Sequence, residues 1–299
     1  MSSFLVFTGL LLVVAVLLQR LPQAASIADH LNWWVLNIAL PAMVLELIPK
    51  LKLDPHLWYL VFSQWLGFAL TMAVFLPLGR ALHWSRERLA SVLLLTSLSN
   101  TAFVGLPLVG ALRGEDGLPL AMFADQIGCF IALSVGGAVL VAVFRGERTS
   151  PRTVATGMLR FPPFVALLVA LVVHALGGWP LLVSDSLHRI SSTLAPIAMF
   201  SVGLRLRLRP VPGQRSALGL ALGWKLLLMP LVTWTLGLAF GIKGLPLTVS
   251  VLETAMPPMF STVMIARAND FDPEFADTTL SVALLLSFLT VPAWSLLLP

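Results

Sequence analysis

Long apolar stretches separated by short polar links run through the whole of this 299-residue chain. Each stretch is of about the length, roughly 18 to 25 residues, that a helix needs to cross a bilayer. The pattern therefore predicts an all-α polytopic membrane protein with ten transmembrane helices and no inserted soluble domain. The predicted segments are Phe4–Leu21, Leu31–Ile48, Leu57–Leu82, Leu89–Leu112, Leu118–Phe144, Met158–Leu176, Leu187–Leu204, Ala217–Phe240, Leu245–Ala268 and Phe275–Leu298.

The fourth segment is interrupted by polar residues near its middle. A backbone group without a partner in hydrocarbon costs several kcal/mol, so helices break at this depth only beside protein or a wet cavity. The polar cluster, with Gly105 and Pro107 downstream of it, predicts a broken helix that lines a binding site. The alternative is a helix contact through small polar residues with a proline kink. The interrupting residues are Thr96, Ser97, Ser99, Asn100 and Thr101.

Matching positions in the two halves of the chain indicate an internal repeat. Pro41 lies 155 positions before Pro196, and the same offset carries Asn100 to Ala255, inside the polar and proline-containing stretch 253–258. Five segments in each half is an odd number, so the second half would cross the membrane in the opposite direction. We therefore expect two inverted five-helix repeats whose broken helices, the fourth and the ninth, cross each other.

Composition places the chain in a membrane and charge orients it. Hydrophobic residues make up 58% of the sequence and charged residues 11%, against about 25% charged in an average soluble domain. The basic residues sit in short loops, so we expect no nucleic-acid partner. They concentrate after the odd-numbered segments, which by the positive-inside rule puts both termini outside the cytoplasm, in an inner or plasma membrane. Examples are Arg86, Arg88, Arg145, Arg205, Arg207 and Arg209.

Glu253 is the sharpest candidate for chemistry. A carboxylate inside a span costs roughly 2.5–3.5 kcal/mol on insertion scales, so it marks a site unless it is paired. The competing interpretation is an ion pair with Lys225, the only basic residue deep in a predicted span. Pro257 and Pro258 free upstream carbonyls, and these oxygens with Glu253 resemble a site for a hard cation. The helix ends beyond the breaks would offer N–H groups to an anion.

Two other polar positions lie inside predicted spans, and two charged residues lie near span ends. Gln64 is a candidate ligand or an interhelical hydrogen bond, and Asp125 is either an ion carrier or a residue near the membrane surface. We expect Glu46 at the interface and Arg267 to reach the cytoplasmic face, with contact to a substrate carboxylate as the alternative for Arg267. The lone cysteine, Cys129, excludes an intramolecular disulfide.

Enzyme motifs are missing from the sequence. It contains no Ser-His-Asp pattern, no His set at metal spacing and no phosphate loop, and its five histidines are scattered. The expectation is a protein that is not an enzyme and that carries no cofactor, with sodium considered only as a coupling ion.

Three blocks of the sequence resemble the auxin efflux carrier family, which includes bacterial malate and malonate permeases and the plant auxin exporters. The resemblance covers essentially the whole chain, and the Asn-Thr…Gly-x-Pro block is its most specific part. The blocks are Leu31-Asn32 with Ala39-Leu40-Pro41, Ser99-Asn100-Thr101 with Gly105-Leu106-Pro107-Leu108, and Ala255-Met256-Pro257-Pro258 with Asp272-Pro273-Glu274.

The resemblance implies the fold of the sodium/bile-acid symporter superfamily and an elevator-like mechanism. A transport domain, residues 56–152 and 213–299, would move against a scaffold, residues 1–55 and 153–212, often as a homodimer formed through scaffold helices. The plant members work without sodium and carry an Asn-containing ninth-helix pattern that this chain lacks. Gln64, Ser99-Asn100 and Glu253 instead resemble the ion-binding set of the sodium-coupled branch. Sodium symport, proton coupling and uniport all stay open.

The sequence thus predicts a secondary transporter of a small organic anion, a carboxylate. An auxin-like carboxylate exporter without sodium coupling is the first alternative, and a membrane receptor or sensor on the same fold is the second. The substrate-binding candidates are Asn100, Thr101, Ala102, Pro257 and Pro258; the ion-binding candidates are Gln64, Ser99, Asn100, Asp125 and Glu253; the expected helix breaks are Gly105, Pro107, Pro257 and Pro258.

Overall fold

The computed structural model describes residues 3–52, 54–206 and 214–298, and this part of the chain is almost entirely helical. Its only β-type pairing is an isolated antiparallel bridge between Ser99 and Pro258. Two of the basic loop residues used for orientation, Arg207 and Arg209, lie outside the described residues.

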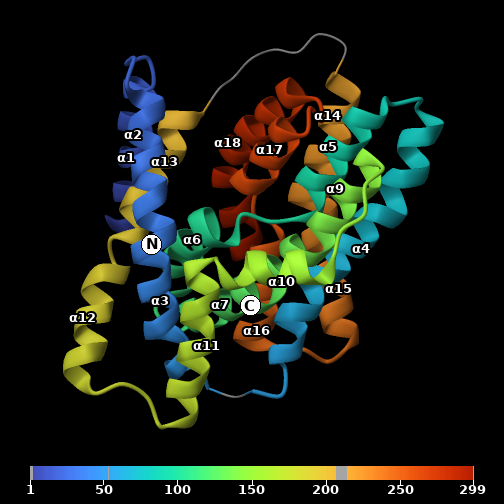
Figure 1. Ribbon diagram of the computed structural model, residues 1–299. Helices are drawn as coiled ribbons and strands as arrows, with labels where there is room; N and C mark the ends of the chain where they lie inside the picture. Colours follow the sequence, from blue (N-terminus) through green and yellow to red (C-terminus); the bar gives the residue numbers. More distant parts are fainter. Residues whose placement is uncertain (1–2, 53, 207–213, 299) are drawn as a thin grey trace.

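The helices follow the apolar pattern, and their arrangement is shown in Figure 1. Several long runs are divided by π-helical turns. The first part of the chain contains α1 (Ser3–Leu18), α2 (Ala24–Trp34), η1 (Val35–Ala39), α3 (Leu40–Leu47), η2 (Ile48–Lys50), α4 (Leu57–Ala81), α5 (Arg86–Ser97), η3 (Thr101–Gly105), α6 (Leu106–Arg113), α7 (Gly117–Phe123), η4 (Ala124–Cys129), α8 (Phe130–Ala132), η5 (Leu133–Gly137) and α9 (Ala138–Arg145). The second part contains α10 (Pro151–Leu159), α11 (Pro162–Ala175), α12 (Leu181–Ser191), α13 (Leu194–Arg205), α14 (Arg215–Gly223), η6 (Trp224–Leu228), α15 (Met229–Ala239), α16 (Gly244–Thr254), α17 (Phe260–Ala268) and α18 (Pro273–Leu297).

Five continuous helical runs in the described residues are long and apolar enough to cross a membrane by themselves. A sixth is reached if α10 and α11, which meet at an angle of 77°, count as one span. The predicted number of ten spans therefore stays a prediction. The five runs are Ala24–Lys50, Leu57–Ala81, Gly117–Arg145, Arg215–Ala239 and Pro273–Leu297.

The sixth and seventh predicted segments differ from the helices of the structure. The sixth was expected to begin at Met158 after a polar link, but α10 already starts at Pro151, where Ser150 accepts a hydrogen bond from the Arg152 N–H. The seventh was expected as one run, but the chain turns between α12 and α13 at Ser192 and Thr193. Apolar periodicity does not report such turns, because a short helix on either side has the same pattern.

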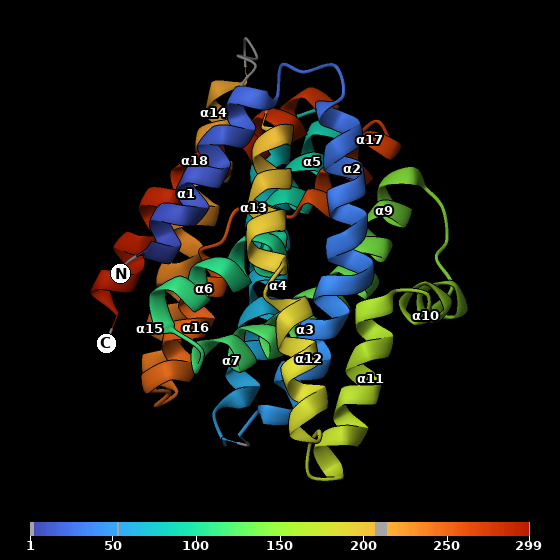
Figure 2. The ribbon, with the colours of Figure 1, turned by 90° about the vertical axis from the view of Figure 1, so that its left-hand side faces the viewer.

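The helices gather into two groups (Figures 1 and 2). In one group α1 and α2 pack on α13, while α3 packs on α11 and α12. In the other group α4 packs on α5 and α16, α15 on α16, and α18 on α5 and α17. The groups touch where α13 meets η3, α1 meets α6 and α3 meets α7. The pieces of the interrupted fourth segment, η3 and α6, therefore lie at the boundary between the groups.

Candidate functional site

Two broken helices meet at the centre of the candidate site. The first break separates α5, which ends at Ser97, from η3, which begins at Thr101. The second separates α16, which ends at Thr254, from α17, which begins at Phe260. Ser99 and Pro258 pair as an antiparallel bridge, and the Asn100 backbone N–H donates to the Pro257 carbonyl at 2.8 Å. Part of the backbone hydrogen bonding that each broken helix gives up is therefore recovered from the other break.

The position of the first break corrects one prediction. Gly105 lies inside η3 with helical backbone angles, and Pro107 occupies the first turn of α6, where its missing N–H is tolerated. The chain is instead extended at Leu98, and Asn100 caps the new helix by accepting a hydrogen bond from the Phe103 N–H at 3.1 Å. Gly105 and Pro107 are thus not the helix break, whereas Pro257 and Pro258 do lie in the second break, as expected.

Glu253 is fully buried in the last turn of α16, and neither of its carboxylate oxygens has a hydrogen-bond partner. It packs directly against Gly105 of η3, where an added β-carbon would lie 2.5 Å from Glu253 Oε2. The ion pair with Lys225 that competed with the site interpretation is not formed between these two described residues. Glu253 is therefore a buried acid that has no partner to neutralise it within the described chain.

Two amide groups near the crossing offer unused donors. Asn100 is 2% exposed, and its Nδ2 has no partner; Gln64 of α4 is 4% exposed, and its Nε2 has none either. The orientation of the Asn100 amide follows from its cap, because only the oxygen can accept from Phe103. Gln64 lies against Gly128 of η4, where an added β-carbon would be 2.8 Å from Gln64 Cγ. Both groups are suited to an acceptor atom of a ligand.

Asp125 is deeply buried within the protein, and its depth in the membrane stays a prediction. It is 2% exposed on the π-helical turn η4. Thr101 donates its hydroxyl to Asp125 Oδ1, and the adjacent Gln126 donates its amide to Oδ2 at 2.7 Å. Thr101 was expected to touch the substrate. Its hydroxyl instead donates to Asp125, and this hydrogen bond links η3 to η4. Ala102 is also buried, at 7% exposure.

Ser99 accepts hydrogen bonds from two other helical segments at the crossing, a role that the sequence alone did not reveal. Its hydroxyl accepts a hydrogen bond from Lys225 Nζ of η6 at 2.6 Å. Its carbonyl accepts from the Cys129 thiol of η4 at 3.2 Å. The sequence indicated this role only through the position of Lys225 deep in an apolar run, and it did not show which residue Lys225 would contact. Residues of three π-helical turns, a feature often found at functional sites, thus converge on the crossing.

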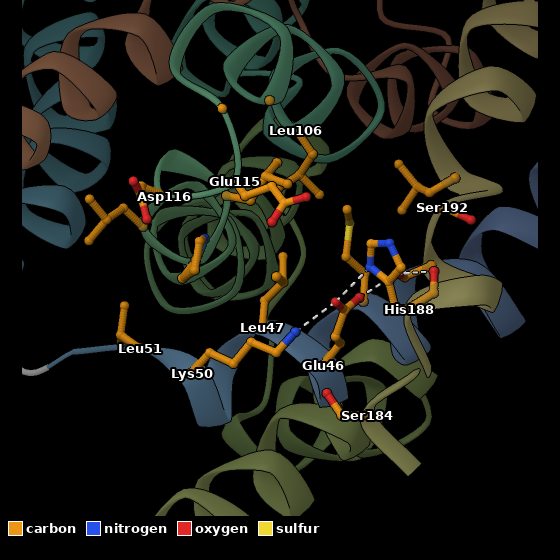
Figure 3. Close-up of a pocket in the computed structure, with 18 of the residues that line it drawn as sticks. Glu46, Leu47, Lys50, Leu51, Leu106, Glu115, Asp116, Ser184, His188 and Ser192 are labelled. Atoms are coloured by element: carbon orange, nitrogen blue, oxygen red, sulfur yellow. Dashed lines mark hydrogen bonds and ion pairs between the residues drawn. The ribbon is translucent and has the colours of Figure 1, made fainter. Parts of the chain in front are cut away.

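A cavity of about 1150 Å³ lies between the two groups of helices (Figure 3). One side is formed by α3, η2 and α12, and the other by α6, the following loop and α7. Of the predicted site residues, only Pro107 lines it. Its lining residues include Glu46, Lys50, Lys52, Leu106, Pro107, Glu115, Asp116, Ser184, His188 and Ser191.

Glu46 is buried at 3% exposure in the last turn of α3, and its expected position at the membrane interface stays a prediction. It accepts hydrogen bonds from Lys50 at 2.9 Å, from His188 at 2.9 Å and from the Ser191 hydroxyl (Figure 3). These contacts hold α12 against α3. Arg267 likewise is not free for a ligand, because it forms a two-pronged ion pair with Asp277.

Comparison with known proteins also indicates a membrane transporter. A family model described as membrane transport protein matches residues 14–295. An uncharacterized transporter of Methanothermobacter thermautotrophicus is 26% identical over 285 residues, 91% of this chain and 89% of that protein. A Rhizobium meliloti protein provisionally named a malonate transporter is 26% identical over 291 residues, 89% of this chain and 88% of that protein.

A plant relative matches a shorter region. Auxin efflux carrier component 2 of Arabidopsis thaliana is 26% identical over 110 residues, which is 36% of this chain and 17% of that protein. The family model covers far more than half of the sequence, and the relatives are named as transporters and not as enzymes. The chain therefore belongs to the membrane transport protein family of auxin-efflux-carrier-like and malonate-permease-like proteins, and it is an integral membrane protein rather than an enzyme.

Proposed function

We propose that this protein is a secondary transporter of a small organic anion, a carboxylate, which binds at the crossing of the two broken helices. The observation that carries the proposal is the unused Asn100 Nδ2 donor at the start of the helical run Thr101–Arg113. The buried ammonium of Lys225 donates a hydrogen bond to Ser99, the residue directly before Asn100 in the chain. A helix N-terminus, a free amide donor and a buried cation together favour a negatively charged oxygen ligand.

The proposed architecture has ten spans in two inverted repeats. The two breaks are related by the offset of 155 positions, and they pair with each other through Asn100 and Pro257. Crossing half-helices at repeat-related positions are the expected arrangement for a substrate site near the bilayer midplane. The two broken helices and the shorter helices α1, α11 and α13 would then complete the count beside the five long runs.

The proposed mechanism moves one group of helices against the other. The group of α1–α3 and α10–α13 corresponds to the scaffold, residues 1–55 and 153–212, and the remaining helices correspond to the transport domain, residues 56–152 and 213–299. Support comes from the packing, which is concentrated inside each group, and from the cavity at their boundary. A homodimer through scaffold helices is part of the same proposal, and its test is the mass of the purified protein in detergent.

The proposed orientation places both chain termini and the cavity on the extracytoplasmic side. The cavity is lined by residues that follow even-numbered predicted segments, such as Lys50 and Glu115. Most loop arginines, including Arg86 and Arg145, follow odd-numbered segments, and the positive-inside rule assigns those loops to the cytoplasm. The described conformation would then be one that opens outward.

Binding and flux together test the proposal. The purified protein is heated with malonate, malate, succinate, acetate and an aromatic acetic acid, each against a neutral analogue of similar size. A ligand at about a hundred times its dissociation constant stabilises by nearly 3 kcal/mol, so a carboxylate that binds raises the melting temperature. Malonate is the first candidate, because the Rhizobium relative carries that name.

Uptake of the radiolabelled acid into proteoliposomes then separates transport from sensing. Sustained uptake above protein-free vesicles is the expected result. Binding without flux would favour the receptor alternative, and neither binding nor flux of any acid in the panel would refute the proposed function.

A further inference from the structure

We propose that the ammonium group of Lys225 is a built-in cation of the crossing, so that transport needs no sodium ion at Ser99. This inference rests on the proposed transport function and deepens it. Family resemblance points to sodium at Gln64, Ser99, Asn100 and Glu253, but the side chains around Ser99 do not fit that ion.

Lys225 is held firmly in place at the crossing. It is 2% exposed, on the π-helical turn η6. The residue before it, Trp224, donates its indole N–H to Thr71 of α4 at 2.9 Å. The residue after it, Leu226, accepts at its carbonyl from the Trp294 indole of α18 at 2.9 Å. Hydrogen bonds on both sides of Lys225 therefore fix the backbone from which its ammonium reaches Ser99 Oγ, 2.6 Å away.

The oxygens of Ser99 and Asn100 that a sodium ion would need already have other partners, whereas the unpartnered carboxylate oxygens of Glu253 lie on α16 against Gly105. Ser99 Oγ accepts from Lys225, the Ser99 carbonyl accepts from Cys129, and Asn100 Oδ1 accepts from the Phe103 N–H. The unused atoms of Asn100 and Gln64 are amide nitrogens, which donate and do not bind cations. A sodium ion on Ser99 Oγ would also sit beside an ammonium group, and two like charges in a dry site repel strongly.

In the described part of the chain, the buried charges around the crossing are one ammonium group, that of Lys225, and two carboxyl groups. Glu253 and Asp125 are buried acids around the same crossing, and Asp125 is satisfied by neutral donors, Thr101 and Gln126. Within the described residues, Lys225 forms no ion pair with either acid. A buried positive charge compensates nearby acids over longer distances in a low-dielectric interior. The side chain thus supplies from within the protein what a coupling sodium ion would supply only while bound.

The first experiment uses sodium alone on the wild-type protein. Melting temperatures are measured in sodium chloride, potassium chloride and choline chloride at equal ionic strength, with no carboxylate present. We expect the three curves to coincide. A stabilisation that is specific to sodium, and that saturates with its concentration, would overturn the inference without touching the proposed transport function.

The second experiment measures [14C]malonate uptake into proteoliposomes in sodium buffer and in choline buffer. Equal initial rates are expected for the wild type. Lys225→Met should lower uptake about tenfold or more in both buffers, and Lys225→Arg should retain more uptake than Lys225→Met because it keeps the charge. Lys243→Ala, which removes an exposed lysine before α16, is the matched control with unchanged uptake.

The outcomes separate the two proposals. Uptake that requires sodium, full uptake by Lys225→Met in choline, or equal loss in Lys225→Met and Lys225→Arg would each overturn the role of Lys225. The wild-type sodium comparison involves no substitution, so misfolding of a variant cannot hide the result. Absence of malonate uptake by the wild type in every buffer would count against malonate transport, while the sodium melting curves would still test the inference.

Discussion

The carboxylate of Glu253 occupies the space that a side chain at position 105 would need. A β-carbon added to Gly105 would lie 2.5 Å from Oε2 and 3.0 Å from Oε1 of Glu253. This contact joins the last turn of α16 to the π-helical turn η3, one piece from each broken helix. Gly105 is therefore required by the approach of a buried acid and not by unusual backbone angles.

Replacing Gly105 by alanine should destabilise the protein and reduce uptake. The added methyl group displaces the Glu253 carboxylate, and overpacking of this kind typically costs about 1–3 kcal/mol. The measurement is the melting temperature together with proteoliposome uptake. Gly219→Ala, on an exposed position of α14 with no atom within 4 Å of the added carbon, is the matched control and should be neutral or stabilising by up to about 1 kcal/mol.

A double substitution checks the cause of that effect. Glu253→Ala removes the atoms that the new methyl group meets, so Gly105→Ala should cost less stability in the Glu253→Ala background than in the wild type. Equal costs in both backgrounds would show that the Gly105–Glu253 contact is not responsible.

Changing Glu253 or Asn100, whose side chains have polar atoms without a hydrogen-bond partner, should abolish transport while the protein stays folded. Glu253→Gln keeps the shape of a carboxyl that has no hydrogen-bond partner, and Asn100→Ala removes the unused Nδ2 donor. We expect uptake to fall about tenfold or more in each variant. Asn100→Ala also loses the cap on Phe103, which costs about 1 kcal/mol of stability. Transport like that of the wild type in both variants would refute the assignment of the site.

Glu46→Gln should destabilise the protein without acting on the crossing. The substitution exchanges an acceptor for a donor where Lys50, His188 and Ser191 all donate, and a buried mismatch costs about 1–3 kcal/mol. The melting temperature in detergent is the measurement. Asp185→Asn breaks the exposed pair with Arg189 at the same cavity and should cost less than about 1 kcal/mol. Equal effects of the two substitutions would contradict a structural role for Glu46.

Cysteine labelling tests the proposed orientation. Asp116→Cys, at the exposed loop lining the cavity, should react with an impermeant maleimide added to intact cells. Arg148→Cys, in the loop after α9, should react only after the membrane is permeabilised. The native Cys129 is buried and gives little background. The reverse pattern of labelling would place the termini in the cytoplasm.

Apolar runs predicted the described helices well, because hydrocarbon forces each backbone group to find a partner within its own helix. The polar stretches around Asn100 and Glu253 were likewise visible, since polar residues inside long apolar runs are rare. The location of the first break, in contrast, was not visible in the sequence. Gly105 and Pro107 looked like the interruption, yet both are compatible with helix in context, and the chain opens instead at Leu98, where the second broken helix supplies a partner.

The sequence by itself determined that the chain is a helical membrane protein, and it located the two interrupted helices and their buried acid. Only the tertiary structure decided which side chains meet. Lys225 is 126 positions from Ser99, and Asp125 is 24 positions from Thr101. Such pairings depend on how helices pack, and the apolar pattern of one helix carries no information about which neighbour will face its polar residues. That is why the sequence left an ion pair of Lys225 with Glu253 as the alternative to a binding site, whereas Lys225 donates a hydrogen bond to Ser99 in the structure.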